Sequence, residues 1–234
     1  PCIPCNAVSI VTGENKVLSN HIASSLGLNV PQELEKDNEN GIFRPVSLGN
    51  SLGVQRGFSC SEKQGIYQEF IKGHEITTPL VYNAIEKKME VLPTVVFAPL
   101  NNDPEWYYGE SDKHKQQGYE FKLINLDSKL ERKYIELAST MSIQTFCRID
   151  ARVKCNELNE MIKTLETGAR FDNTYFIEIN VMPTIRDNNS FCYSFQSIKQ
   201  SNSISEYIQL QKEIIGTINI HSFLLASSMM SFIP

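Results

Sequence analysis

The sequence lacks several features that mark particular classes of protein. The 234-residue chain has no stretch of about 18 consecutive apolar residues, so no transmembrane helix is expected. Its 22 lysines and arginines are outnumbered by 27 aspartates and glutamates and never gather into a long basic cluster, which argues against a nucleic-acid-binding surface. The opening segment, PCIPC, has neither the basic nor the apolar part of a signal peptide.

Cysteine is also scarce and scattered. The six cysteines stand at positions 2, 5, 60, 147, 155 and 192, a distribution that does not resemble a disulfide framework. Cys2 and Cys5 form one CxxC motif, but no second pair of cysteines or histidines follows at the spacing of a zinc site. Free thiols in a reducing compartment are the simplest interpretation, and a cytoplasmic location is therefore expected.

Patterns typical of helices and of strands alternate along the chain. Apolar residues at helical spacing predict a helix over 13–28 and another that begins after an N-terminal cap at Asp127. The stretch GIYQEFIKGHEITTPLVYN predicts two strands separated at Gly73. Several predicted strands follow one another directly, which favours an α+β fold, or an α/β fold with an antiparallel sheet.

One apolar strand, NTYFIEINVMP (173–183), carries an acid and an amide two residues apart. Side chains alternate along a strand, so Glu178 and Asn180 should share a face. Strict alternation places them with Thr174, Phe176 and Met182, and it assigns the packed face to the other residues of the strand: Tyr175, Ile177, Ile179 and Val181.

The segment CRID repeats this pattern with Arg148 and Asp150. If the two strands pair, Asp150, Glu178 and Asn180 converge, and such a set of oxygen ligands favours Mg²⁺. The alternative is that these residues lie on the solvated face of an antiparallel sheet.

A glycine- and serine-containing stretch, RPVSLGNSLGV, lies upstream. Gly49 and Gly53 permit positive φ angles and close approach of a ligand to the backbone, and Asn50 and Ser51 add side-chain donors. Following Arg44, such a loop predicts a phosphate-binding site, although an ordinary turn is an equally good interpretation of the loop alone. It is not a Walker A motif, because Gly53 is followed by valine.

Five segments occur in the order found in one known family: GENK, FRPVSLGNSLGV, YQEFIKGHE, RID and EINVMP. In this order the sequence resembles the ATP-grasp ligases, most closely the D-alanine–D-alanine ligase-like enzymes. The resemblance implies an ATP-grasp fold in which two α+β subdomains hold ATP between them. It divides the chain into a helical lead-in (1–31), a small lid subdomain (32–80) and a large subdomain (81–234), and it implies that an amino-terminal substrate domain is missing.

The same resemblance implies roles for individual residues. The phosphates of ATP would contact Lys16 and Arg44 on one side and Lys113 on the opposite side, under a lid formed by Gly49, Asn50, Ser51 and Gly53. The adenine would lie against a hinge formed by Gln68, Glu69, Phe70 and Ile71. The ribose would contact Glu75. Asp150, Glu178 and Asn180 would bind two Mg²⁺ ions, with Mn²⁺ as an alternative. Arg148 would be catalytic, stabilising charge on the transferred phosphoryl group.

The implied activity is ATP-dependent joining of a small-molecule carboxylate to an amine through an acyl phosphate, with amino acids as the expected substrates. A homodimer is common in the family. This sequence departs from the family after Pro183, where Thr184 and Ile185 replace Gly-Met; this argues against D-alanine specificity. Thr184, Arg186 and Asn189 are the candidate substrate-binding residues. Two other functions stay open: a nucleotide-binding or regulatory module without ligase activity, and a non-enzymatic binding domain.

Overall fold

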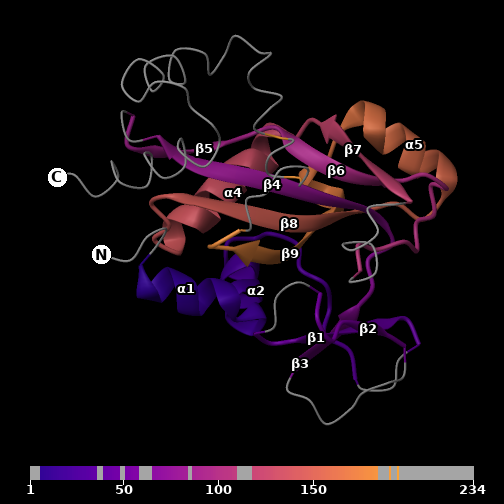
Figure 1. Ribbon diagram of the computed structural model, residues 1–234, viewed down its shortest axis with the longest axis horizontal. Helices are drawn as coiled ribbons and strands as arrows, with labels where there is room; N and C mark the ends of the chain where they lie inside the picture. The colour runs from indigo at the N-terminus through magenta and orange to yellow at the C-terminus, as the bar shows by residue number, and fades with distance from the viewer. Residues whose placement is uncertain are drawn as a thin grey trace.

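The protein consists of two antiparallel sheets and a set of helices, arranged as Figure 1 shows for the computed structural model. The structure describes residues 6–35, 39–47, 51–57, 65–83, 86–109 and 118–183, together with residues 190 and 194. Within these ranges no helix is both long and apolar enough to cross a membrane.

The larger sheet has six strands, and its strand order is β7-β6-β4-β8-β9 with β5 paired to β4. Each pairing is antiparallel, so the α+β prediction with sequentially adjacent strands is confirmed. The strands are β4 (Gly73–Asn83), β5 (Lys88–Val91), β6 (Thr94–Pro99), β7 (Tyr119–Ile124), β8 (Phe146–Lys154) and β9 (Thr174–Asn180).

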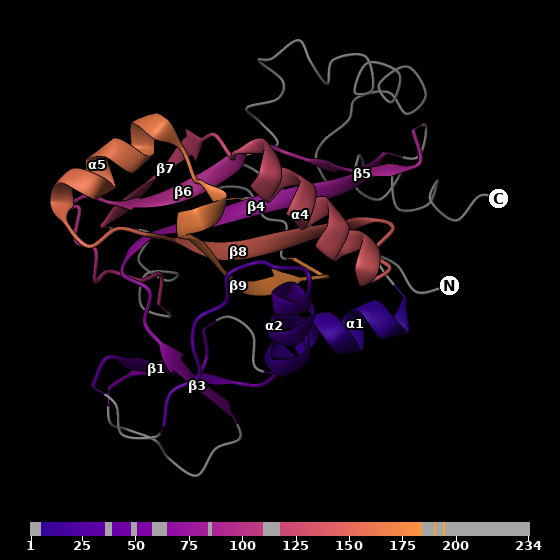
Figure 2. The ribbon, with the colours of Figure 1, turned by 180° about the vertical axis from the view of Figure 1, so that it is seen from behind.

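Two helices cover one face of this sheet, as Figure 2 shows from behind. Helix α4 (Ser128–Thr140) begins where predicted, because the Asp127 carboxylate accepts hydrogen bonds from the first amides of the helix. Helix α5 (Leu158–Thr167) ends at Gly168 and is followed by the short 3₁₀ helix η1 (Phe171–Asn173) before β9. Their apolar faces pack on the sheet in one core that includes Leu130, Tyr134, Leu137, Met161, Ile76, Leu80 and Ile149.

The amino-terminal region forms two short helices beside β9: α1 (Ala7–Glu14) and α2 (Lys16–Ser25). A single helix over 13–28 was expected, and that prediction is wrong. Asn15 adopts an extended conformation, and its side chain accepts hydrogen bonds from the amides of Val17 and Leu18. It therefore ends α1 and caps the start of α2, which places Lys16 at the first position of a new helix.

The smaller sheet has the strand order β2-β1-β3 and lies below the large sheet in Figure 1. It is built from β1 (Gly41–Pro45), β2 (Gln55–Arg56) and β3 (Gly65–Glu69). The chain passes from the small sheet to the large one through residues 70–72, and β4 then begins at Gly73. The subdomain boundary expected after residue 80 therefore lies inside β4.

Gly73 occupies a position that requires glycine. Its φ is 126°, and a Cβ atom there would lie 2.0 Å from the carbonyl oxygen of Val153. Any other residue would collide with β8, so the glycine allows β4 to join the sheet directly after the connection. The predicted break at Gly73 is confirmed.

Strand β9 departs from strict alternation. Asp150 pairs with Glu178 but Ala151 pairs with Phe176, so Ile177 is an extra residue in a β-bulge. The bulge sends Phe176, which is 1% exposed, into the core with Ile179 and Val181, and it turns Ile177 toward the cavity described below. The expected faces of the residues before Glu178, which are Thr174, Tyr175, Phe176 and Ile177, are therefore wrong, whereas that of Glu178 is correct.

Candidate functional site

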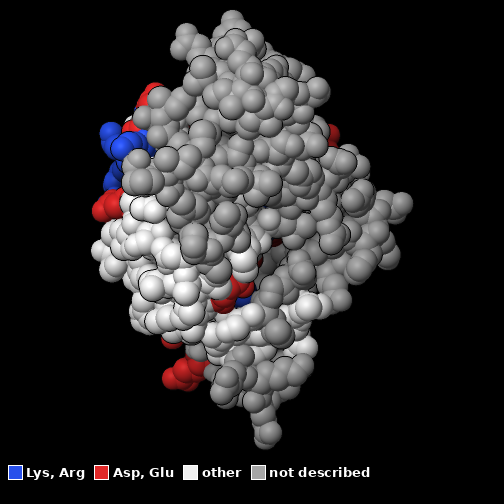
Figure 3. Space-filling view, turned by 60° about the vertical axis from the view of Figure 1, so that its left-hand side comes forward, with Lys and Arg blue, Asp and Glu red and all other residues white. Residues whose placement is uncertain are grey.

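A cavity lies between the two sheets, and residues from both of them line it. In the space-filling view, acidic side chains and a basic one recede into a hollow at mid-height (Figure 3). The cavity brings together most of the predicted site residues that the structure describes: Lys16, Arg44, Ser51, Gln68, Glu69, Phe70, Ile71, Glu75, Asp150 and Glu178.

The two acids of the predicted cation site face each other across paired strands. Asp150 on β8 stands opposite Glu178 on β9, and Arg148 stands opposite Asn180. The Asn180 amide group donates to Asp150 Oδ2 at 2.8 Å and to Glu178 Oε1 at 3.4 Å. The predicted convergence of these side chains is therefore what the strand register produces.

Arg148 binds Asp150 at two points. Its Nε donates to Oδ1 at 2.9 Å and its Nη2 to Oδ2 at 2.6 Å, and the Thr77 hydroxyl donates to the same Oδ1. A guanidinium held in this bidentate way has a fixed direction and keeps its charge. Burial by itself would lower the pKa of Arg148, but the negative charge and hydrogen bonds of Asp150 outweigh burial and raise it.

Lys16 and Arg44 bring positive charge to the other side of Glu178. Lys16 Nζ lies 3.5 Å from Glu178 Oε2, and its side chain is only 8% exposed. Arg44 is buried and donates to the carbonyl oxygen of Ile177 at 2.9 Å and to Gln68 Oε1 at 2.7 Å. The Arg44 contacts tie β1 of the small sheet to both β9 and the hinge.

The two acids respond differently to this environment. Burial raises the pKa of Asp150, and the nearby charge of Glu178 raises it further, against the opposing effect of Arg148. Burial would also raise the pKa of Glu178, but the charges of Lys16, Arg44 and Arg148 together outweigh it and lower this pKa. Two carboxylates that share a site are expected to separate in this way, with the better compensated acid ionising first.

The predicted hinge is fixed by its own neighbours. The Gln68 side chain, which accepts from Arg44, donates to the carbonyl oxygen of Pro31 at 3.3 Å, and the Glu69 carboxylate accepts from the amide of Gln32 at 3.1 Å. Phe70 is 9% exposed and packs under the guanidinium of Arg56, which lies 3.8 Å from its ring centroid. The hinge is therefore attached to the segment before β1 and to the small sheet.

The loop that was expected to bind phosphate is described in part. Ser51 and Gly53 both adopt positive φ angles, 58° and 71°, which belong to a tight turn. Ser51 lines the cavity and donates to the carbonyl oxygen of Tyr108 at 3.3 Å, whereas Gly53 is not among the lining residues. The remaining predicted residues lie outside the described part of the chain: Gly49, Asn50, Lys113, Thr184, Arg186 and Asn189.

The cavity wall also contains eight residues that were not predicted, and those with polar side chains are Arg152, Tyr107 and Tyr108. Arg152 continues the alternation of Arg148 and Asp150 along β8, so the sequence CRIDAR already contained the signal. The two tyrosines lie in a connection whose position next to Glu75 depends on tertiary contacts, including a hydrogen bond from the Tyr108 amide to Glu75 Oε2 at 3.2 Å.

The donor set fits a hard cation. Two carboxylates and one amide come together, and oxygen atoms of these groups are the ligands that a hard cation prefers. Among the described residues no group of three or more His, Cys, Asp or Glu side chains forms a metal cluster. A cation would therefore rely on Asp150, Glu178 and the oxygen of Asn180, whose amide would have to present that atom instead of its nitrogen.

Solved structures with the same arrangement identify the fold. A D-alanine–D-alanine ligase from Bacillus anthracis, complexed with ATP, superposes with a TM-score of 0.55 at 15% identity over 83% of this chain. An L-amino acid ligase from Bacillus licheniformis gives 0.55 at 18% identity over 98% of this chain, and a D-Ala:D-Ser ligase from Enterococcus faecalis gives 0.56 at 14% over 83%. The chain has the ATP-grasp fold.

The ATP-grasp chain corresponds to only part of these proteins. It covers 64% of the B. anthracis ligase, 60% of the E. faecalis ligase and 50% of the B. licheniformis ligase. No protein-family profile and no curated protein matches its sequence. At 14–18% identity the agreement with these structures lies in the fold, and the chemistry has to be argued from the site itself.

Proposed function

We propose that this protein is an ATP-dependent carboxylate–amine ligase that forms an amide bond through an acyl phosphate, with amino acids as substrates. The observation that carries the proposal is the pairing of Asp150 with Glu178 at the floor of a cavity that is also lined by Lys16 and Arg44. Paired acids and several cations in a single cavity suit a polyphosphate bound with a divalent ion better than they suit a neutral ligand.

Asp150, Glu178 and Asn180 are the residues that would hold Mg²⁺, or Mn²⁺ in its place. A divalent ion bound there would neutralise negative charge on the phosphate oxygens. The bidentate hydrogen bonds from Arg148 orient the Asp150 carboxylate, which would be one of the ligands of such an ion.

The protein's own part in the reaction is positioning and electrostatic stabilisation. Lys16 and Arg44 bind phosphate oxygens, because both are buried cations directed into the cavity. Arg148, held in one direction by Asp150, stabilises the charge that develops as the γ-phosphoryl group moves to the carboxylate and again as the amine attacks the acyl phosphate. Glu75 accepts hydrogen bonds from the ribose, and the hinge contacts the adenine.

ADP release across a panel of amino acids tests the activity. The protein is incubated with ATP, MgCl₂ and single or paired amino acids, and ADP is measured by a coupled assay while the amide product is detected by mass spectrometry. We expect ADP and amide in equal amounts for at least one pair. ATP binding without ADP release for any pair would contradict the ligase assignment.

A nucleotide-binding or regulatory module without ligase activity is the second candidate. The observation in its favour is that the Asp150 carboxylate already accepts hydrogen bonds from Arg148, Thr77 and Asn180, which compete with a metal ion for its oxygens. Calorimetry separates the two: a regulatory module would bind ATP with Mg²⁺ and release no ADP with any amino acid. A cytoplasmic location, a homodimer and amino-acid recognition by Thr184, Arg186 and Asn189 stay predictions within the ligase proposal.

A further inference from the structure

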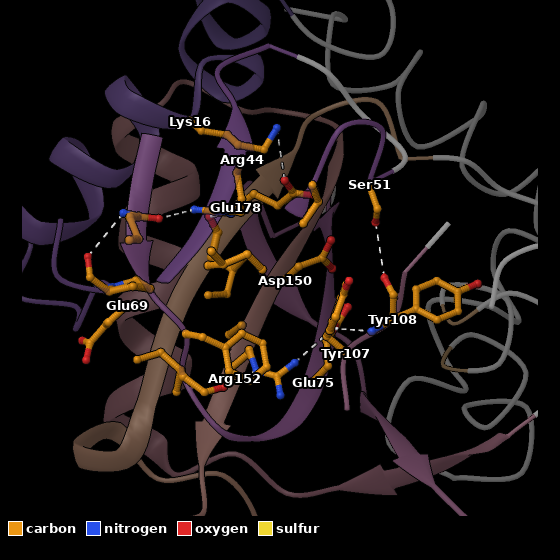
Figure 4. A pocket seen from close by; sticks show the side chains of 18 residues that line it. Lys16, Arg44, Ser51, Glu69, Glu75, Tyr107, Tyr108, Asp150, Arg152 and Glu178 are labelled. Carbon is orange, nitrogen blue, oxygen red and sulfur yellow. Dashed lines mark hydrogen bonds and ion pairs between the residues drawn. The ribbon is translucent and has the colours of Figure 1, made fainter. Parts of the chain in front are cut away.

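Arg152 is a buried arginine on the cavity wall that the proposed chemistry does not use. Arg152 is 5% exposed. Burial lowers its pKa to about 10, although the charge of Glu75 acts in the opposite direction. The residue lies at the opposite end of the cavity from Lys16, with Asp150 between them (Figure 4). A buried cation whose hydrogen bonds and ion pair do not involve Asp150 or Glu178 needs a separate explanation.

The partners of Arg152 come from three separate segments. Its Nε donates to the carbonyl oxygen of Ile71 in the hinge, and its Nη2 donates to Gly73 at the start of β4 at 2.6 Å and to Trp106 at 2.9 Å. Its Nη1 lies 3.4 Å from the Glu75 carboxylate, which stands directly opposite on β4. One planar guanidinium therefore fixes the hinge, the first residues of β4 and the 106–108 segment relative to each other.

These contacts bear on the nucleoside end of the cavity. Holding the Ile71 carbonyl fixes the peptide plane between Ile71 and Lys72, next to the hinge side chain of Phe70, over which the guanidinium also lies at 4.7 Å. The Glu75 carboxylate is held from two sides, by Arg152 and by the Tyr108 amide. Both contacts are made to Oε2, so they fix the orientation of this carboxylate in the cavity wall.

We propose that Arg152 is a positioning residue for the nucleoside part of the nucleotide: by holding Ile71, Gly73, Trp106 and Glu75 together, it sets the hinge and the ribose-binding acid in place before ATP binds. This inference rests on the proposed function. It separates two tasks in one cavity, because among the described residues the hydrogen bonds and ion pair of Arg152 go to the hinge, to β4 and to Trp106 and not to Lys16 or Arg44. Preorganised groups bind with less loss of conformational entropy, so the effect falls on affinity for the base and ribose.

The experiment compares binding of ATP with binding of inorganic tripolyphosphate, both with MgCl₂, by isothermal titration calorimetry. Arg152→Met withdraws all four interactions and is expected to weaken ATP binding about 10- to 100-fold. Arg152→Lys keeps the charge but cannot span the same acceptors, so we expect a loss of about tenfold. Tripolyphosphate affinity should change by less than about twofold in both variants, because it contacts only the other end.

The matched controls are Arg132→Met and Arg132→Lys, which alter an exposed arginine on α4 and should change neither affinity. Circular dichroism and thermal melting check that each variant is folded, and the lysine variant serves if the methionine variant does not fold. ATP affinity that is unchanged in a folded Arg152 variant, or an equal loss for ATP and tripolyphosphate, would overturn the inference alone. Failure of the unsubstituted protein to bind ATP would overturn the proposed function and the inference together.

Discussion

The two ends of the cavity are built on different principles. At the end formed by β8, β9 and α2, charged side chains face one another: Asp150, Glu178, Arg148 and Lys16. At the end formed by the hinge and the start of β4, one guanidinium is bound mainly to backbone carbonyls. The first arrangement can exchange its internal ion pairs for a ligand's charges, whereas the second resists rearrangement.

The two ends differ because their charges are compensated by different groups: charged side chains at one end and backbone carbonyl oxygens at the other. The lowered pKa of Glu178 depends on cations contributed by α2, β1 and β8, so moving one element alters the balance. Arg152 has most of its hydrogen-bonding capacity satisfied by carbonyl oxygens that move only with the backbone. We infer that the charged end is the part that responds to ligands and the carbonyl-bound end is the fixed reference.

The largest effect is expected from removing a charge at the responsive end. Glu178→Gln keeps the size of the side chain but removes an acid that would hold the divalent ion, and it should lower the rate of ADP formation by roughly 10²–10³-fold or more. The fold should survive, because the Glu178 side chain is 27% exposed and glutamine keeps its size.

Glu131→Gln, an exposed change on α4, is the control and should keep full activity. Steady-state kinetics with the amino-acid pair found in the panel gives the measurement, and melting temperatures check the fold. Undiminished turnover in folded Glu178→Gln would show that this acid does not hold the ion.

A smaller effect is expected from Lys16→Met, which removes a phosphate contact and also changes the titration of Glu178. Loss of the lysine should weaken ATP binding by about tenfold or more. It should also raise the pKa of Glu178, because Lys16 makes the largest contribution of the nearby charges that lower this pKa. The acid limb of ATP binding should therefore shift to higher pH, since Glu178 must lose its proton before it can hold a cation.

Calorimetric titrations with ATP and MgCl₂ between about pH 4 and 8 would follow this shift around the usual pKa of glutamate. Lys129→Met, which alters a lysine at the start of α4, is the control. If ATP affinity falls at the same acid pH in Lys16→Met and in the unsubstituted protein, Lys16 does not control the titration of Glu178.

The charged end could be predicted from the sequence because most of its residues are related by short-range patterns within single strands. Arg148 and Asp150, and likewise Glu178 and Asn180, share a face through simple strand alternation, and pairing of the two strands brings them together. The one local feature that escaped prediction is the bulge at Ile177. No glycine or proline stands there, and the extra residue becomes apparent only in the register against Ala151.

The fixed end could not be predicted in the same way. Arg152 is visible as the next residue on the face of Asp150, but its partners Ile71, Gly73 and Trp106 lie 81, 79 and 46 residues away in sequence. No pattern within β8 reveals which carbonyls a guanidinium will meet. The break at Asn15 was missed for a related reason: an apolar stripe continues across a capping residue that interrupts the backbone.

The smallest expected effect concerns whether exposed ion pairs add to the rigidity that Arg152 gives the nucleoside end. Glu105 binds Arg56 of the small sheet at 2.8 Å and Lys72 beside the hinge at 2.5 Å, and hydrogen bonds with Lys72 and Arg56 lower its pKa. The Glu105 side chain is 41% exposed and its ion pairs are screened by solvent, so Glu105→Gln should cost no more than about 1 kcal/mol, which corresponds to a melting temperature about 2–4 °C lower.

The pH dependence of this stabilisation has a defined sign. Because the folded-state pKa of Glu105 is lowered, the contribution is fully present above the usual pKa of glutamate and is lost as the pH falls through the lower, folded value. The melting temperatures of Glu105→Gln and the unsubstituted protein should therefore differ at pH 7 and converge in acid. Glu120→Gln is the matched control, because Glu120 pairs with Lys122 inside β7 and joins no separate elements. An equal loss in both variants would mean that the ion pairs of Glu105 act only as surface charges, which would leave Arg152 as the main support of the nucleoside end.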